Sequence, residues 1–216
     1  MLLKDLDEQD IEFVFSAIEK SFLIKFEEEE LKNVSNIDDV CDLVCEKVNL
    51  QNTNVDIFEI AFDRVKKSFL NVLNIDEATI KSNTKLSEIL PRKNRLRKTK
   101  LIEKDLKVKL HLLRGPAWVI NLLTIITIIG FILLFVYSFW GISIIIFAIL
   151  GFEFCKDYGK EFRYATFGDL VKKSVLYNYK RYSEVSNAND VEKIVNGLFI
   201  DILGFDEKEL NKESKF

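Results

Sequence analysis

Residues 115–152 read "GPAWVINLLTIITIIGFILLFVYSFWGISIIIFAILGF", a run of 38 positions without a charged residue. One bilayer crossing takes about 20 apolar residues, and a soluble core helix of this length would carry charges. The run therefore predicts a transmembrane helical hairpin over residues 115–154 that turns near Tyr137–Gly141. One tilted span followed by an interfacial stretch is the alternative that the sequence leaves open.

Basic residues flank this run on both sides. Those before it are Lys107, Lys109 and Arg114, and those after it are Lys156, Lys160 and Arg163. Lysine and arginine beside membrane spans favour the cytoplasmic side, so an even number of crossings is expected to leave both flanks there. The frequent lysine, isoleucine and asparagine indicate a low-GC bacterial source. We therefore expect a protein of the bacterial inner (cytoplasmic) membrane whose soluble parts face the cytoplasm.

Charge is unevenly spread along the chain, which indicates surfaces that meet charged partners. Residues 1–50 hold fourteen acidic and five basic residues, a net −9, whereas the juxtamembrane segment 91–114 holds ten basic and two acidic residues, a net +8. Basic clusters beside a membrane attract anionic lipid. The predicted lipid contacts are Arg92, Lys93, Arg95, Arg97, Lys98, Lys100 and Arg114. The segment can also be read as a topology signal alone, and nucleic acid is not expected because aromatic residues do not alternate with the basic ones.

The soluble parts are predicted to be helical, since two prolines and eight glycines leave little room for strands and turns. Apolar residues at helical spacing predict helices at 11–22, 35–48, 57–73 and 191–203. Ser35 with Asp38, and Thr166 with Asp169, have the spacing of a capping box at a helix start. The predicted fold class is mainly α, with small helical bundles and a transmembrane helical hairpin.

Two segments occur twice in the chain at the same offset of 130 residues. "NIDEATIKSNTKL" at 74–86 corresponds to "GFDEKELNKESKF" at 204–216, and "NIDDV" at 36–40 corresponds to "TFGDL" at 166–170. The same order and spacing indicate an internal duplication. The membrane run and its basic lead-in then fall within the second unit.

These repeated pieces resemble parts of acyl carrier proteins, and together they cover more than half of the chain. Residues 11–44, "IEFVFSAIEKSFLIKFEEEELKNVSNIDDVCDLV", resemble the second half of that fold. "AFDRVKKSFLNVLNIDEATIKSNTKLSEIL" at 61–90 and "DVEKIVNGLFIDILGFDEKELNKESKF" at 190–216 resemble its first helix and long loop. The resemblance implies carrier-like bundles whose helices are permuted along the chain.

It also implies a division of the chain. The expected parts are a carrier-like second half (helices 2–4) at 1–50, a first helix and loop at 57–90, the basic segment at 91–114, the hairpin at 115–154, a cytoplasmic helical segment at 155–182, and a second first-helix copy at 190–216. The copy at 190–216 is expected to complete the bundle of 1–50. The alternative pairing, in which residues 1–48 pack on 57–73, stays open.

The serine that carries phosphopantetheine in acyl carrier proteins is missing here. The resemblance places it at the start of the second helix, within an Asp-Ser-Leu triplet. The matching places read "KDLDEQD" at 4–10 and "PRKNRLRK" at 91–98. We therefore expect no phosphopantetheine and no other cofactor.

The sequence also offers no catalytic or metal-binding constellation. His111 is the single histidine, and Cys41 and Cys45 have no partner ligands for a four-coordinate metal. Neither a glycine-rich phosphate loop nor a nucleophile elbow is present. A non-enzymatic protein without a metal site is the prediction.

The expected function is that of a binding module that docks a basic protein partner, as carrier proteins dock basic patches on enzymes. The predicted docking face is Glu27, Glu28, Glu29, Glu30, Asp38, Asp39 and Asp42, with Phe15 and Phe22 beside it. The alternative is a structural or immunity-type membrane protein in which the hairpin is the working part. Membrane lipid is an expected partner in both cases, and the sequence leaves a homodimer open.

Overall fold

The structure is a computed structural model that describes residues 6–51, 56–183 and 186–204. The chain is mainly α-helical with a helical hairpin, so the predicted fold class is confirmed. In the second copy of the repeated stretch, at 204–216, all residues after Gly204 lie outside the described residues. The chain divides into two compact units, Met1–Lys67 with Val171–Phe216, and Ser68–Leu170, and the boundaries fall within helices α4 and α9.

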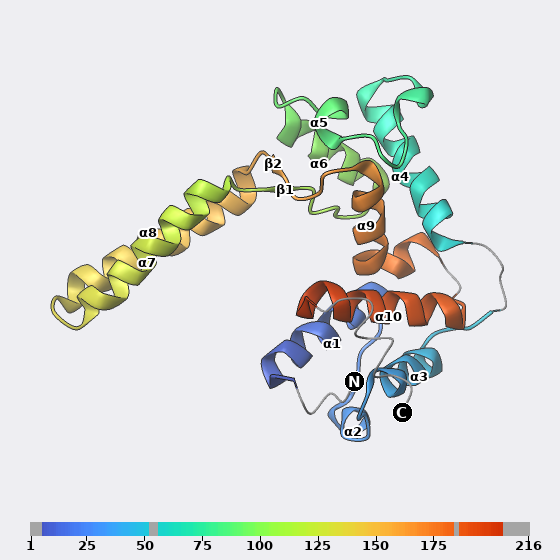
Figure 1. The fold of residues 1–216 in the computed structure, drawn as a ribbon, viewed down its shortest axis with the longest axis horizontal. Helices are drawn as coiled ribbons and strands as arrows, with labels where there is room; N and C mark the ends of the chain where they lie inside the picture. The colour runs from blue at the N-terminus through green and yellow to red at the C-terminus, as the bar shows by residue number, and fades with distance from the viewer. Residues whose placement is uncertain (1–5, 52–55, 184–185, 205–216) are drawn as a thin grey trace. The chain divides into compact units, whose positions relative to one another are not determined.

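The first unit is a helical bundle. Its helices are α1 (Glu8–Phe22), α2 (Glu28–Leu31), α3 (Ile37–Lys47) and α10 (Ala188–Leu203), together with the start of α4 (Ile57–Leu73) and most of α9 (Phe167–Tyr182). Helix α10 packs against both α1 and α3 (Figure 1). Its apolar stripe is fully buried and comprises Val191, Ile194, Val195, Leu198 and Phe199. The C-terminal helix therefore shares one core with residues 1–50.

Side-chain caps fix the starts of the helices, and one of them differs from the prediction. Helix α3 begins after Asn36, whose Oδ1 accepts from Asp39 N at 2.9 Å. The predicted Ser35–Asp38 box is wrong by one residue, because the Asp39 carboxylate accepts from both Ser35 N (2.7 Å) and Asn36 N (3.2 Å). The Thr166–Asp169 box is confirmed, with both reciprocal hydrogen bonds at 3.1 Å.

The second unit carries the apolar hairpin. It comprises the end of α4, the 3-10 helix η2 (Glu77–Thr79), α5 (Leu86–Ile89), α6 (Arg95–Leu106), β1 (Leu113–Arg114), α7 (Ala117–Leu134), α8 (Ser138–Tyr158), β2 (Glu161–Phe162) and the start of α9. Its core includes the Phe69 and Phe167 rings, which meet edge to face with centroids 5.1 Å apart. The first copy of the repeat contributes Ile80 and Leu86 to this core, where both are buried.

The basic segment 91–114 contains a twelve-residue helix, α6, which was not predicted from the sequence.

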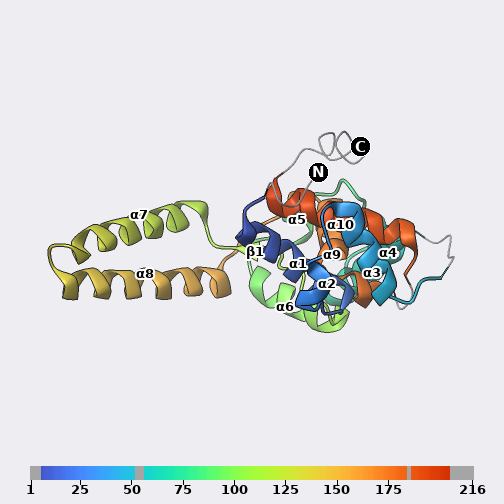
Figure 2. The same cartoon turned by 90° about the horizontal axis from the view of Figure 1, so that it is seen from below.

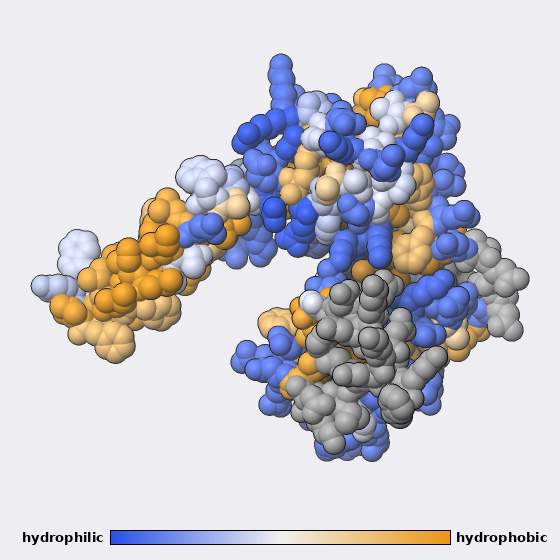
Figure 3. Space-filling view, in the orientation of Figure 1, coloured by the Kyte–Doolittle hydropathy of each residue, from blue (hydrophilic) through white to orange (hydrophobic). Residues whose placement is uncertain are grey.

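Helices α7 and α8 run antiparallel and lie side by side (Figures 1 and 2). Eighteen residues of α7 span about 27 Å, close to the roughly 30 Å of a bilayer's hydrocarbon core. Only 11% of each apolar stretch is buried, and apolar side chains cover the surface of both helices (Figure 3). Because a soluble core helix would bury such a surface, the hairpin is suited to a membrane.

Gly141 allows close contact between α7 and α8, and its backbone hydrogen bond marks the start of α8. A Cβ added at Gly141 would lie 2.6 Å from Leu134 N, so the two backbones approach too closely there for any larger residue. Gly141 N donates to Tyr137 O at 3.0 Å, which places Gly141 already in the first turn of α8. The turn is therefore at 135–137 rather than at the predicted Tyr137–Gly141.

Candidate functional site

The predicted acidic face divides into exposed carboxylates and carboxylates with a structural role. Glu27, Glu28, Glu29, Asp38 and Asp42 are exposed. Glu27 also caps α2, because its side chain accepts from the backbone N of Glu30. The other four side chains can meet a partner without breaking the capping hydrogen bonds of α2 or α3.

Glu30 and Asp39 instead hold the two helices in place. Glu30 Oε2 accepts from Glu27 N at 2.8 Å, and its Oε1 lies 2.7 Å from Lys47 Nζ. The backbone hydrogen bond from Glu27, followed by the bond to Lys47, lowers the pKa of Glu30 below its ordinary value. The Asp39 carboxylate caps the start of α3. These two residues position the face and are less suited to contact a partner.

Phe15 and Phe22 are buried in the first unit, so neither ring is exposed to a partner of this face. The Phe15 ring meets Phe26 edge to face at 5.5 Å, and the Phe22 ring lies 5.0 Å from that of Tyr179. The exposed aromatic side chain of α1 is Phe13, at 65% exposure. Sequence reasoning missed it, although its position off the apolar stripe of α1 was the available signal.

Most of the predicted lipid contacts are at the surface. Arg92, Lys93, Arg97, Lys100 and Arg114 are exposed, and Lys98 is half-buried. They lie on α6, on the segment before it, and on β1, all in the unit that carries the hairpin. Their basic side chains are therefore available to a partner of negative charge, except that Arg92 already pairs with Glu161 at 3.3 Å.

Arg95 is the exception, and its predicted contact with lipid is wrong. The side chain is only 7% exposed. Its Nε donates to Leu90 O at 3.0 Å, its Nη1 donates to Lys160 O at 2.6 Å, and its guanidinium lies 4.0 Å from the centre of the Phe162 ring. A planar group that bonds carbonyls and stacks on a ring is suited to this role, whereas a lysine is not.

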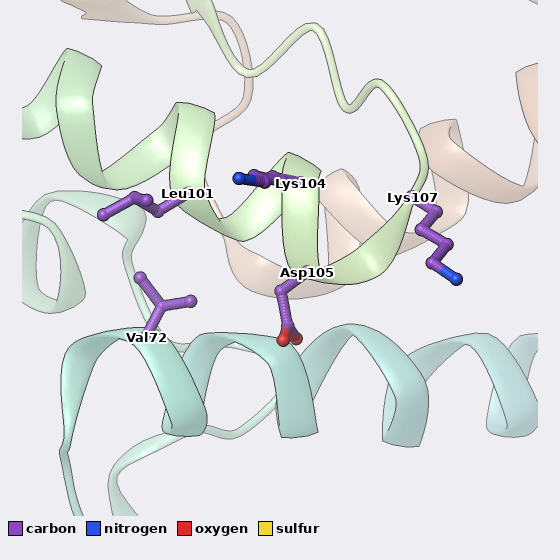
Figure 4. A pocket seen from close by; sticks show the side chains of 5 residues that line it. All are labelled: Val72, Leu101, Lys104, Asp105 and Lys107. Atoms are coloured by element: carbon purple, nitrogen blue, oxygen red, sulfur yellow. The ribbon is translucent and has the colours of Figure 1, made fainter.

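A surface hollow of about 510 Å³ lies between α4 and α6 (Figure 4). Val72 lines it from α4, and the other lining residues are Leu101, Lys104, Asp105 and Lys107. All four of these others are exposed, so the hollow is shallow. Its lining includes no histidine, cysteine or serine that could act as a nucleophile or a base beside the carboxylate.

The thiols of α3 are poorly suited to chemistry. Burial, followed by the charge of Asp38, raises the pKa of Cys41 to about 12, and burial also raises that of Cys45. Both remain protonated at neutral pH, and the thiolate is the reactive and metal-binding form. Across the residues that the structure describes, no cluster of three or more histidine, cysteine, aspartate or glutamate side chains could hold a metal ion.

The hydroxyls inside the hairpin bond to their own helices. Thr124 and Thr127 of α7 donate to Ile120 O at 3.0 Å and to Leu123 O at 2.9 Å. In α8, Ser143 donates to Phe139 O at 2.9 Å. Such back-bonding satisfies these hydroxyls within one helix, so they do not form a polar path along the hairpin.

Comparison of the chain with protein-family models, with curated proteins and with solved structures finds no match. The resemblance to acyl carrier proteins therefore stays a prediction from the sequence.

Proposed function

We propose that this protein is a membrane-anchored, non-enzymatic docking module. In this proposal carrier-like helical units are held at the cytoplasmic face of a bacterial inner membrane by the α7–α8 hairpin. The exposed carboxylates of α2 and α3 bind a basic surface of a protein partner. The observation that carries the proposal is that Glu27, Glu30 and Asp39 organise the helix starts, while Glu28, Glu29, Asp38 and Asp42 stay exposed outside those caps.

Charge and anchoring would act together in this function. Exposed charges of one sign attract a partner of opposite sign and speed encounter more than they tighten the final complex. A membrane tether would add to this by raising the local concentration of any partner that is also at the membrane. The protein would then recruit or position a basic partner at the bilayer surface.

The start of α1 supports docking rather than acyl carriage. The resemblance places the carrier serine there, but Asp7 occupies the N-cap and accepts from Gln9 N at 3.0 Å. An aspartate carboxylate cannot receive the phosphopantetheine arm that a serine hydroxyl receives. The start of α6, at Asn94 and Arg95, likewise offers no hydroxyl.

The test is affinity purification of the detergent-solubilised full chain with two charge-reversal variants. The docking variant is Glu28→Lys, Glu29→Lys and Asp42→Lys, and all three positions are exposed. The matched control is Glu12→Lys, Asp63→Lys and Glu88→Lys, also exposed. We expect one protein to be recovered with the native chain and the control but lost with the docking variant. Equal recovery with both variants would contradict the acidic face.

A second candidate is that the hairpin is the working part, as in a structural or immunity-type membrane protein. The wide apolar surface of α7 and α8 favours it, because such a surface can also bind other membrane helices. Replacing residues 117–156 by an unrelated transmembrane hairpin separates the two functions. If the acidic face does the work, recovery of the partner survives the replacement.

A further inference from the structure

The two strands of the second unit close the base of the hairpin. In this antiparallel ribbon Arg114 lies opposite Glu161 and Leu113 lies opposite Phe162 in the strand register. The ribbon continues through a hydrogen bond of 2.9 Å from Arg163 N to Leu112 O. It directly precedes α7 and directly follows α8, so it lies where the chain enters and leaves the apolar hairpin.

Basic residues gather on this ribbon and around it. The flanking segments 107–114 and 156–163 contain six basic residues against Asp157 and Glu161. Arg114, Lys160 and Arg163 are all exposed. Opposed and next-but-one residues of a ribbon share a face, which brings Arg114, Glu161 and Arg163 together. The carboxylate of Glu161 already pairs with Arg92 at 3.3 Å, so the positive charge at this base is in excess.

Buried contacts fix the position of these charges. Arg95 binds the carbonyl of Lys160 and stacks on Phe162, which ties β2 to α6. A Cβ added at Gly159 would collide with the backbone of Arg114, so the chain entering α7 and the chain leaving α8 are in close contact. The basic side chains therefore project from a pre-organised backbone rather than from a loose linker.

We propose that Arg114 and Arg163, on one face of the ribbon, and Lys160, next to Glu161 on the other, bind anionic phospholipid headgroups around the base of the hairpin. Guanidinium groups bind phosphate oxygens with two parallel hydrogen bonds, and a lysine adds a third positive charge. A bilayer that surrounds α7 and α8 brings its headgroups to this level. The inference rests on the membrane anchoring in the proposed function but not on the acidic docking face.

The two tryptophans report separately on the two ends of the hairpin. Trp118 is 71% exposed in the first turn of α7, next to the basic base. Trp140 is 64% exposed in the first turn of α8, near the hairpin turn. Trp140→Phe leaves a reporter at the base, and Trp118→Phe leaves one at the far end. Each variant is reconstituted in phosphatidylcholine vesicles that contain a minority of phosphatidylglycerol. Two preparations are compared, one with brominated phosphatidylglycerol and one with brominated phosphatidylcholine, and the mole fraction of brominated lipid is the same in both.

We expect brominated phosphatidylglycerol to quench Trp118 about twofold more than brominated phosphatidylcholine does, because basic residues enrich anionic lipid beside them. Trp140 should be quenched equally by the two. Adding Arg114→Gln, Lys160→Gln and Arg163→Gln should remove the preference at Trp118. The matched control Lys20→Gln, Lys25→Gln and Lys32→Gln, at exposed positions of the first unit, should keep it.

Equal quenching of Trp118 by the two lipids in the otherwise native chain would overturn the inference and leave membrane anchoring intact. Quenching of neither tryptophan by either lipid would overturn both, since the hairpin would then lie outside the bilayer. The single-tryptophan comparison needs no change to the basic residues, so it is decisive even if the triple variant fails to fold.

Discussion

The hydroxyl of Ser21 lies within the hydrogen-bond ladder of α9, next to Tyr179. Its Oγ accepts from Tyr179 N at 3.2 Å and donates to Leu176 O at 2.6 Å. Helix α9 is kinked at the adjacent Asn178, whose φ of −143° and ψ of 32° are not helical. A side chain inserted into the helical ladder is a recognised cause of such a kink. Ser21 thereby joins α1 to α9, although 155 positions separate it from Leu176 along the chain.

Replacing Ser21 by alanine is expected to destabilise the first unit. The substitution leaves Tyr179 N and Leu176 O without these two hydrogen bonds. Water cannot replace the lost hydroxyl, because Ser21, Tyr179 and Leu176 are all buried. A buried polar group without its partner costs about 1–3 kcal/mol. Chemical denaturation in detergent, followed by circular dichroism, measures the change. The control is Ser87→Ala at an exposed position, which should leave the midpoint unchanged. An unchanged midpoint for Ser21→Ala would show that the bridge does not stabilise the fold.

Replacing Arg95 by lysine is expected to loosen the base of the hairpin. The lysine keeps the charge but cannot reproduce the bonds to both Leu90 O and Lys160 O together with stacking on Phe162. We expect a loss of about 2 kcal/mol in stability. Limited trypsin digestion, with cleavage after Lys160 and Arg163 identified by mass, should be faster than in the native chain.

The matched control for this digestion is Arg97→Lys, which changes an exposed arginine of the same helix. It should be cleaved at the native rate. If Arg95→Lys is also cleaved at the native rate, the buried guanidinium does not hold the ribbon.

A cysteine at position 115 is expected to form a disulfide with Cys155 under mild oxidation. A Cβ at Gly115 would lie 2.9 Å from Cys155 Cβ, and a disulfide takes about 3.5–4.5 Å between these atoms, so a small relaxation suffices. The test uses Gly115→Cys in a chain with Cys41→Ala and Cys45→Ala. Counting free thiols before and after reduction measures the bond.

The same count distinguishes a hairpin from a single tilted span. In a hairpin the start of α7 lies beside the end of α8, whereas a single span would separate positions 115 and 155 by the length of the membrane. Two free thiols after oxidation would therefore contradict the hairpin.

Asp190 is expected to make the first unit less stable as the pH rises. Burial raises the pKa of this carboxyl above its ordinary value of 3.8, with the Lys193 charge acting against the shift and Asp56 adding to it. A group whose pKa is raised on folding stabilises the folded state below its unfolded pKa, and this contribution is lost as the pH rises through the folded pKa. Asp190→Asn removes the titration and can still accept from Tyr179 OH, which lies 3.5 Å from Asp190 Oδ2.

The variant should therefore gain stability over the native chain at neutral pH, and the difference should shrink as the pH falls toward 3.8. Thermal unfolding of the two proteins across this range measures it. A difference that grows on acidification would show that the shift has the opposite sign.

Local patterns predicted the helices well, because each helix buries a stripe of its own residues. The predicted helix 57–73 coincides with α4, and the uncharged run contains both helices of the hairpin. The errors come from competition between neighbouring groups. Ser35 and Asn36 are both good helix caps, and Asn36 is the cap because its Oδ1 accepts from Asp39 N at 2.9 Å.

The sequence by itself determined the apolar hairpin, the amphipathic helices and the uneven charge, since these depend on composition and on spacings of a few residues. Only the tertiary structure decided that α10 packs on α1 and α3, that Ser21 enters the ladder of α9, and that Arg95 turns inward while its basic neighbours stay exposed. The physical reason is the same in each case. A hydrogen bond or an apolar contact between distant positions depends on which groups the fold brings within a few ångströms, and no local pattern of side chains specifies that partner.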